Sequence, residues 1–328
     1  MFNDSIKKKK SLLEIALWSF LTFASIFVGG ILIFFTWLIW PIEDFDATRI
    51  VSHESNAYIS SKLDLKDQGI KYLLTKIEEK YVKNPMEAWI ISCFLPSRIS
   101  GGIIYNTDNP NKPNYIIIAD IGWRVRLSSL VRIASYYHGG GKFIAGYSTY
   151  NGYKLIVFGA KTTPIAGLAV VQGKIVASNN IELLKKTLDN TQKGSFVEQP
   201  SINYLYHTMS QYDSLALINN ANGWVTNIIR YEEDKSSYSV FPSIDAVNAI
   251  AIGIDIVDED RINGEIILSQ YLQSSSEMVK EDMMFFAAFF RRVLKTYDVD
   301  IQSDVTIQNN NVHFIFKGNG FSALWGKL

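Results

Sequence analysis

The sequence predicts an α+β fold, with one N-terminal transmembrane helix followed by antiparallel sheets that have helices packed on one face. Three observations support this prediction. Residues 15–40 contain no charged side chain. The chain beyond them alternates segments of strand period with segments of helix period. Short turn signals such as Asn151-Gly152 separate consecutive strand segments, and such turns join neighbouring strands as antiparallel hairpins.

The uncharged segment is long enough to cross a membrane as a helix. At about 1.5 Å per residue it exceeds a hydrocarbon core of about 30 Å, and it is longer than the apolar region of a cleaved signal peptide. Lys7–Lys10 precede the segment, whereas Glu43, Asp44 and Asp46 follow it. This charge bias predicts a cytoplasmic N-terminus at the bacterial inner membrane and a periplasmic or other extracytoplasmic C-terminal domain.

Composition narrows the class of the domain behind this helix. The chain has 32 basic and 32 acidic side chains, so no excess of positive charge favours a nucleic acid as a partner. Cys93 is the single cysteine, so an intramolecular disulfide is excluded. A large secreted eukaryotic domain more often carries disulfides and glycosylation sites, and a bacterial extracytoplasmic setting therefore fits better.

Small side chains within the apolar segment suggest a contact between helices. Ser25 and Gly29 have the small-xxx-small spacing, and Gly30 lies beside them. This spacing lets two transmembrane helices approach closely. We therefore expect Ser25, Gly29 and Gly30 to support a homo-oligomer or docking onto another membrane protein. The alternative is that small residues are simply common in such helices.

Residues 51–198 form the first predicted α+β module, behind a cytoplasmic N-terminus (1–14), the anchor (15–40) and a linker (41–50). Strand-like alternation and helical spacing define its elements, and Ser178 or Asn179 is expected to cap the last helix. The predicted strands are 57–63, 101–105, 115–121, 143–150, 153–158, 165–171 and 174–177, and the predicted helices are 64–81, a segment between 85 and 96, 125–137 and 181–188.

Residues 199–328 form the second predicted module and follow the same β-α-β-β-α-β-β order. An internal duplication and a coincidental parallel of topology both fit this order. Polar turns at 258–263 and 309–311 separate two of its strand pairs. The predicted strands are 215–219, 249–257, 264–272, 299–307 and 312–317, and the predicted helices are near 202–209, 223–230 and 277–297.

Three of these segments carry a family resemblance. Ser55–Ser60 with Leu63–Leu65, the hairpin and helix Gln172–Lys186, and the strand Ser214–Asn219 resemble segments of a widespread bacterial family. Its members are membrane-anchored extracytoplasmic proteins filed as a domain of unknown function. The resemblance covers most of Val51–Gly318. It implies a topology and a location, and it supplies no catalytic residues to assign to this chain.

Catalytic and metal-binding motifs are incomplete. His138–Gly141 looks like the glycine-rich oxyanion loop of lipases, but no suitable G-x-S-x-G nucleophile elbow follows it. Asp258–Asn263 is acidic enough to suggest a calcium loop, yet Ile262 stands where that loop needs an oxygen ligand. The four histidines share no metal-ligand spacing. We therefore expect no cofactor, no bound metal and no recognisable catalytic residue.

The apolar run Met283–Phe290 is the most unusual local feature. A surface helix normally has one apolar stripe, whereas this run is apolar around its whole circumference. One interpretation places it in the core, between a sheet and another helix. The other leaves part of it exposed for a partner protein or lipid, with adjacent basic residues near lipid headgroups. The candidate contact residues are Phe285, Phe286, Phe289, Phe290, Arg291 and Arg292.

These observations favour a non-enzymatic binding or scaffolding role in the bacterial cell envelope. The predicted protein is single-pass and contacts the lipid bilayer through residues 15–40. Its expected partners are another membrane or envelope protein and further copies of itself, and nucleic acid is not expected. The alternative function is an extracytoplasmic hydrolase whose site is assembled from scattered residues and so does not form a motif.

Overall fold

The computed structural model separates into two compact units, Met1–Glu43 and Asp44–Leu328, and each is considered by itself. The helices predicted between residues 64 and 96 and at 125–137 lie largely outside the described residues, as does His138–Gly141. The module boundary predicted between residues 198 and 199 stays a prediction. The structure describes residues 28–33, 36–37, 46–63, 71, 75, 95–105, 112–127, 145–160, 163–189, 195–229, 241–272 and 275–322.

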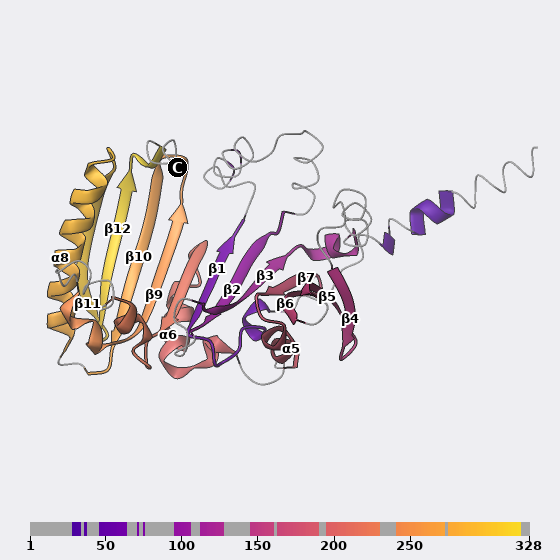
Figure 1. The fold of residues 1–328 in the computed structure, drawn as a ribbon. Helices are drawn as coiled ribbons and strands as arrows, with labels where there is room; N and C mark the ends of the chain where they lie inside the picture. The colour runs from indigo at the N-terminus through magenta and orange to yellow at the C-terminus, as the bar shows by residue number, and fades with distance from the viewer. Residues whose placement is uncertain are drawn as a thin grey trace, which may run out of the picture. The chain divides into compact units, whose positions relative to one another are not determined.

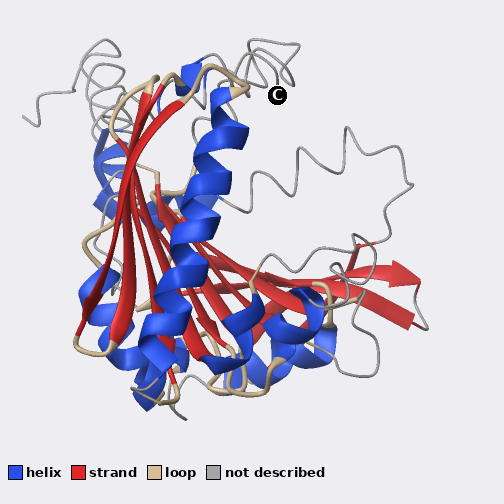
Figure 2. Cartoon of the chain, turned by 90° about the vertical axis from the view of Figure 1, so that its left-hand side faces the viewer, coloured by secondary structure: helices blue, strands red, loops and turns tan. Residues whose placement is uncertain are grey.

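One antiparallel sheet of twelve strands dominates the second unit (Figure 1). Its strand order is β11-β12-β10-β9-β8-β1-β2-β3-β7-β6-β5-β4, so β11 and β4 form the two edges. Seen from the side, the sheet twists strongly between these edges (Figure 2). The strands are β1 (Ala57–Lys62), β2 (Arg98–Ile104), β3 (Asn114–Asp120), β4 (Ala145–Tyr150), β5 (Tyr153–Ala160), β6 (Thr163–Val171), β7 (Lys174–Ser178), β8 (Ser214–Asn219), β9 (Val247–Ile256), β10 (Arg261–Gln270), β11 (Asp300–Gln308) and β12 (Asn311–Asn319).

The strand order runs in the same sequence through both halves of the sheet. The first half reads β1-β2-β3-β7-β6, with β5 and β4 beyond it, and the second half reads β8-β9-β10-β12-β11. The two halves meet where β1 pairs with β8. Because Ala57 pairs with Ile218 and Ser61 with Ser214, this junction is an ordinary antiparallel ladder.

Local turn chemistry explains the hairpins. Asn151 and Gly152 have φ values of 47° and 84°, which is the left-handed pair that a two-residue hairpin turn requires. Gln172 and Gly173, with φ of 40° and 82°, repeat this geometry. Both predicted hairpins are therefore confirmed, with β4 pairing β5 and β6 pairing β7.

Within the described residues, three longer helices accompany the sheet. They are α5 (Ile181–Asp189), α6 (Pro200–Met209) and α8 (Ser276–Lys295). Asn180 caps α5, because its Oδ1 accepts hydrogen bonds from the backbone N–H groups of Glu182 and Leu183. The predicted caps, Ser178 and Asn179, were therefore one or two residues early. Residues 224–229 are also helical, and the short 3-10 helices are η1 (Ala47–Arg49), η2 (Gly122–Leu127), η4 (Phe196–Glu198) and η5 (Pro242–Ala246).

Strand register assigns side chains to two faces of the sheet, because neighbours across a ladder point to the same side. The first face carries Tyr58 and Leu217, which join Phe196 and residues of α5 and α6 in one buried core. The second face carries Ile59, which aligns across the ladders with Ala216, Ile252, Ile266 and Phe314. Phe286 and Phe290 of α8 pack edge-on against Phe314 and Phe316 on this face.

The helices therefore lie on both faces, α5 and α6 on the first and α8 on the second. Figure 2 shows the long helix α8 running along the strands at its end of the sheet. The prediction of an α+β fold with separate sheets and helices on one face is wrong. The described part of the chain is mostly antiparallel β-structure in one continuous open sheet with few helices. The pairing of β1 with β8, which merges the two predicted modules into one sheet, is the physical reason.

The predicted transmembrane helix also requires correction. Within the described part of the chain, no helix has both the length and the apolar composition needed to cross a membrane. In the predicted span 15–40, the structure describes helical residues at 28–33 and 36–37 only, and the rest of the span lies outside the described residues. Hydropathy of the sequence therefore does not establish a spanning helix in this fold.

Candidate functional site

The second face of the sheet is covered unevenly. On β9 and β10, Ile252 and Ile266 pack in the same hydrophobic cluster as Phe286 and Phe290 of α8. On the central strands the side chains of this face stay open, because Ile59 is 47% exposed and Ile117 is 44% exposed. Exposed apolar side chains are ordinary when scattered, but a contiguous group of them marks a candidate interaction site.

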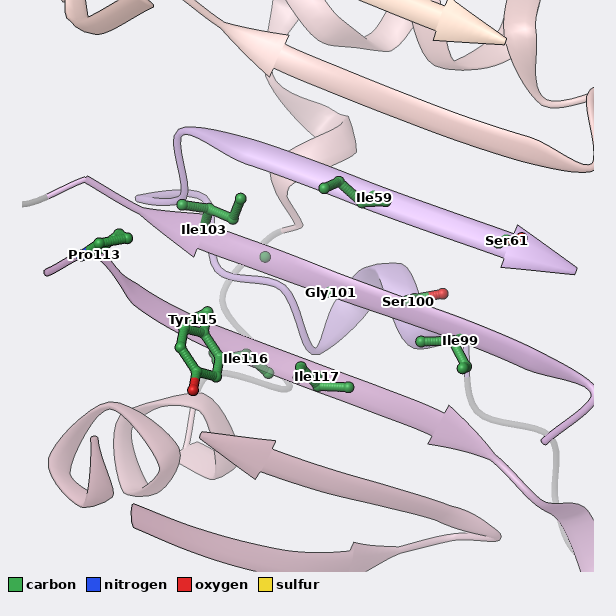
Figure 3. Close-up of a pocket in the computed structure, with 11 residues that line it drawn as sticks. Ile59, Ser61, Ile99, Ser100, Gly101, Ile103, Pro113, Tyr115, Ile116 and Ile117 are labelled. Atoms are coloured by element: carbon green, nitrogen blue, oxygen red, sulfur yellow. The ribbon is translucent and has the colours of Figure 1, made fainter. Parts of the chain in front are cut away.

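These open side chains line a groove across β1, β2 and β3, which we call the isoleucine groove. Figure 3 shows side chains from all three strands around Gly101. The groove has a volume of about 440 Å³. That volume lies in the range of ligand pockets in proteins. The residues that define the isoleucine groove are Ile59, Ile99, Gly101, Ile103, Tyr115 and Ile117.

Gly101 leaves the middle of the groove without a side chain. A Cβ atom at this position would lie 2.6 Å from the backbone oxygen of Ile116 on β3, so no other residue fits without a shift of the backbone. Glycine is needed at position 102 for a different reason. A Cβ atom there would lie 2.7 Å from Cγ1 of Val51 on the first face. The pair thus lets Val51, in the segment that follows η1, lie close to one face and keeps the groove deep on the other.

The groove offers apolar contact and few polar groups. The hydroxyl of Ser61 is already 2.9 Å from the hydroxyl of Ser214 on β8, and the backbone N–H of Tyr115 donates to Oδ1 of Asn179 at 2.9 Å. Lys62, which pairs with Asp213 at 3.2 Å, lies with Tyr58 on the first face and so outside the groove. Within the described residues, this arrangement suits the binding of an apolar surface.

The structure divides the predicted contact residues of α8 between two environments. Phe286 and Phe290 stack on one another and face the sheet. Phe285 and Phe289 point away from the core and are 64% and 52% exposed. Arg291 and Arg292 are exposed as well. Neither the core interpretation nor the exposed interpretation describes the whole run Met283–Phe290, because one side of the helix is packed on the sheet and the other is exposed. A contact with lipid or a partner stays a prediction.

The predicted anchor-helix residues give no packing contact within the described residues. Gly29 and Gly30 lie in the helical stretch 28–33, and no atom lies within 4 Å of a Cβ atom built at either position. Ser25 lies outside the described residues. Self-association through these three residues stays a prediction.

A buried polar cluster on the first face was not predicted from the sequence. Nδ1 of His313 on β12 lies 2.7 Å from Oε1 of Glu265 on β10, and the Tyr212 hydroxyl donates to Oε2 of Glu265 at 3.0 Å. The hydrogen bond from His313 and then that from Tyr212 lower the pKa of Glu265, against the opposing effect of burial. Burial, followed by the nearby charge of Glu265, raises the pKa of Tyr212.

This cluster resembles half of a hydrolase triad, a carboxylate that orients a histidine. The second ring nitrogen of His313, Nε2, is buried and has no hydrogen-bond partner. A triad would place a nucleophilic hydroxyl at that nitrogen. Among the described residues none is within hydrogen-bonding reach, so the cluster suits a structural role better than catalysis. The only signal in the sequence was a lone histidine and a lone glutamate in strand segments, which indicate no pairing.

Comparisons with protein-family models, with curated proteins and with solved structures found no match in any of the three. The resemblance to a family of membrane-anchored bacterial proteins therefore stays a prediction.

Proposed function

We propose that this chain is a non-enzymatic binding protein whose isoleucine groove holds an amphipathic helix of a polypeptide partner. One observation carries the proposal: the same face of the same sheet already holds a helix in its other half. There α8 lies on the second face and inserts Phe286 and Phe290 against Phe314 and Phe316. An apolar sheet surface stabilises such a helix by burying its apolar stripe.

The parallel between the halves supports a helix as the occupant, because Val225 and Ile229 of the helical residues 224–229 pack in the same hydrophobic cluster as Ile252 of β9. The strands under the groove, β1, β2 and β3, hold the positions that β8, β9 and β10 hold in the second half. Ile252 and Ile266 of that second half are packed, whereas Ile59 and Ile117 are open. An open, elongated surface fits the side of a helix better than it fits a small molecule, which usually needs enclosure.

The experiment measures binding of a designed amphipathic peptide of leucine, lysine and glutamate, labelled with a fluorescent dye. Fluorescence anisotropy is recorded as the full-length chain is added. The groove variant is Ile117→Asp, which places a charge among the apolar side chains. The matched control is Tyr204→Asp, because Tyr204 lies on α6, which packs on the first face, and is 44% exposed.

We expect the unmodified chain and Tyr204→Asp to bind the peptide equally. Ile117→Asp should weaken binding by at least about tenfold, because a charge on the groove has to be desolvated when the helix docks. A second peptide of the same composition, with leucines spread around the helix, should not bind. Equal binding by Ile117→Asp and the unmodified chain would refute the proposal.

A further inference from the structure

Aromatic rings cover the three glycines in strands β8 to β12. At each of these glycines, a Cβ atom would collide with the ring of a tyrosine or phenylalanine, so the ring occupies the space that a side chain would fill. The pairs are Gly253 with Tyr212, Gly264 with Phe316, and Gly318 with Phe321. A glycine in a strand leaves an apolar gap in the surface of the sheet, and a ring laid over the gap restores the lost packing.

Gly101 leaves the same kind of gap without such a ring against it. Among the described residues, the three atoms nearest to a Cβ atom at this position all belong to the backbone of β3. Figure 3 shows Gly101 on the middle strand of the isoleucine groove, with Ile59 and Ile117 on the strands to either side. Both isoleucines are exposed, so the hollow above Gly101 is open to an occupant.

The second half of the sheet fills the corresponding position. When the first residues of β1 and β8 are matched, the ladders align Gly101 of β2 with Ile252 of β9. They also align Ile117 of β3 with Ile266 of β10. The same match brings Ile99 to Ile250 and Ile103 to Ile254. The two halves therefore share three isoleucines on this face, and the groove lacks the side chain that Ile252 supplies in the second half.

The missing side chain leaves a hollow of a size that suits an aromatic ring. An apolar cavity of about 150 Å³ holds benzene, and the groove has a volume of about 440 Å³. One ring therefore fits in the groove beside the aliphatic side chains of a docked helix. A shorter side chain such as leucine would leave part of the hollow empty, and the residues around it would lose the contacts that a ring makes.

We infer that the helix bound in the isoleucine groove carries a phenylalanine in its apolar stripe, and that the ring of this phenylalanine lies over Gly101. This inference rests on the proposed function, because it names the side chain by which the same groove selects its partner. Phenylalanine fits better than tyrosine or tryptophan, because the groove offers few partners to a buried O–H or N–H group. Large side chains seated in apolar pockets commonly anchor protein interfaces in this way.

The first experiment compares three peptides that differ at the central leucine of the designed amphipathic helix. One keeps leucine, and the others carry phenylalanine or alanine there. Fluorescence anisotropy with the full-length chain should show the phenylalanine peptide binding about fivefold more tightly than the leucine peptide, because ring packing adds to simple burial. The alanine peptide should bind most weakly. A phenylalanine peptide that binds no more tightly than the leucine peptide would overturn the inference.

A variant of the chain tests where the ring lies. Ile117 is opposite Gly101 across the ladder, just as Phe316 is opposite Gly264. Ile117→Phe should therefore cover Gly101 with the chain's own ring, and the phenylalanine and leucine peptides should then bind equally. The matched control Ile315→Phe should keep the preference for phenylalanine, because Ile315 is exposed on the first face. Thermal unfolding shows whether both variants remain folded. A folded Ile117→Phe chain that keeps the preference would overturn the inference.

Photocrosslinking locates the ring without changing the chain. The peptide is made with benzoylphenylalanine at the central position, and the crosslinked residues are identified by mass spectrometry after digestion. The crosslinks should fall on residues of β1, β2 and β3 that line the groove, and crosslinks elsewhere would contradict a ring over Gly101. Binding of the leucine peptide with no preference for phenylalanine overturns the inference and leaves the proposed function standing. Absence of binding by every peptide overturns both.

Discussion

Nδ1 of His313 lies 2.7 Å from Oε1 of Glu265, and both side chains are buried on neighbouring strands of the first face. Tyr212 reaches the other carboxylate oxygen from the turn that follows α6. One carboxylate therefore connects β10, β12 and the crossing between the two halves of the sheet. A buried carboxylate is stable only while such partners satisfy it.

Acidification should weaken the fold through Glu265. Its folded-state pKa is lowered, so the unfolded chain takes up a proton at higher pH than the folded chain does. The stabilisation is therefore present above the ordinary pKa of 4.5 and is lost as pH falls toward the folded-state value. Urea unfolding at a series of pH values should show a steeper loss for the unmodified chain than for Glu265→Gln. Parallel curves would contradict this assignment.

Alkaline pH should also weaken the fold, in this case through Tyr212. Its pKa is raised in the folded state, so its contribution is complete below the ordinary value of 10.0 and is lost as pH rises further. Tyr212→Phe removes a hydrogen bond to a charged group and should lower the free energy of unfolding by about 1.5–3 kcal/mol at neutral pH. Chemical unfolding should show this difference shrinking above pH 10. A difference that stays constant would exclude the hydrogen bond as its cause.

Gly101→Ala should destabilise the sheet although alanine normally suits a strand better than glycine. The added methyl group would meet the backbone oxygen of Ile116, and the strain should cost about 1–3 kcal/mol. Gly146→Ala is the matched control, since the nearest atom to its Cβ is 4.0 Å away. That variant should change the free energy of unfolding by less than about 0.5 kcal/mol. Equal effects in thermal denaturation would show that the close approach at Gly101 is relaxed in solution.

The two lysine–aspartate pairs should contribute unequally to the free energy of unfolding. Lys174 is buried and pairs with Asp120 at 3.1 Å, whereas Lys62 and Asp213 are both more than a third exposed. Asp120→Asn removes a negative charge beside a buried ammonium group and should cost about 3 kcal/mol. Asp213→Asn should cost less than about 1 kcal/mol, because water screens the exposed pair. Chemical denaturation of both variants checks this, and a smaller effect at Asp120 would reverse the ranking.

Adjacent phenylalanines of α8 should behave differently. Phe286→Ala removes a ring that packs edge-on against Phe314 and should cost about 3 kcal/mol of stability. Phe285→Ala removes a ring that is 64% exposed and should leave the stability of the isolated chain within about 0.5 kcal/mol. Chemical denaturation of both variants measures this difference, and a large loss at Phe285 would place its ring in the core.

The residues differ in how far the sequence predicts their roles. Asn151-Gly152 predicts its hairpin because the left-handed backbone of two adjacent residues is a local property. Alternation in Ala57–Lys62 predicts a strand for the same reason. The sequence predicts only part of the groove, since it shows that Ile59 and Ile117 lie on strands but not that their side chains are exposed. The pairing of Glu265 with His313 has no local signature at all.

The sequence by itself determined the strands, the hairpin turns and the helix α8, because each depends on periods and turn residues within a short stretch of chain. Tertiary structure decided which strands are neighbours, and above all that β1 pairs with β8 and joins both halves into one sheet. It also decided which face α8 covers and which face of β1, β2 and β3 stays open. Those outcomes depend on contacts between distant residues, and the periodicity of a segment contains no information about what lies opposite it.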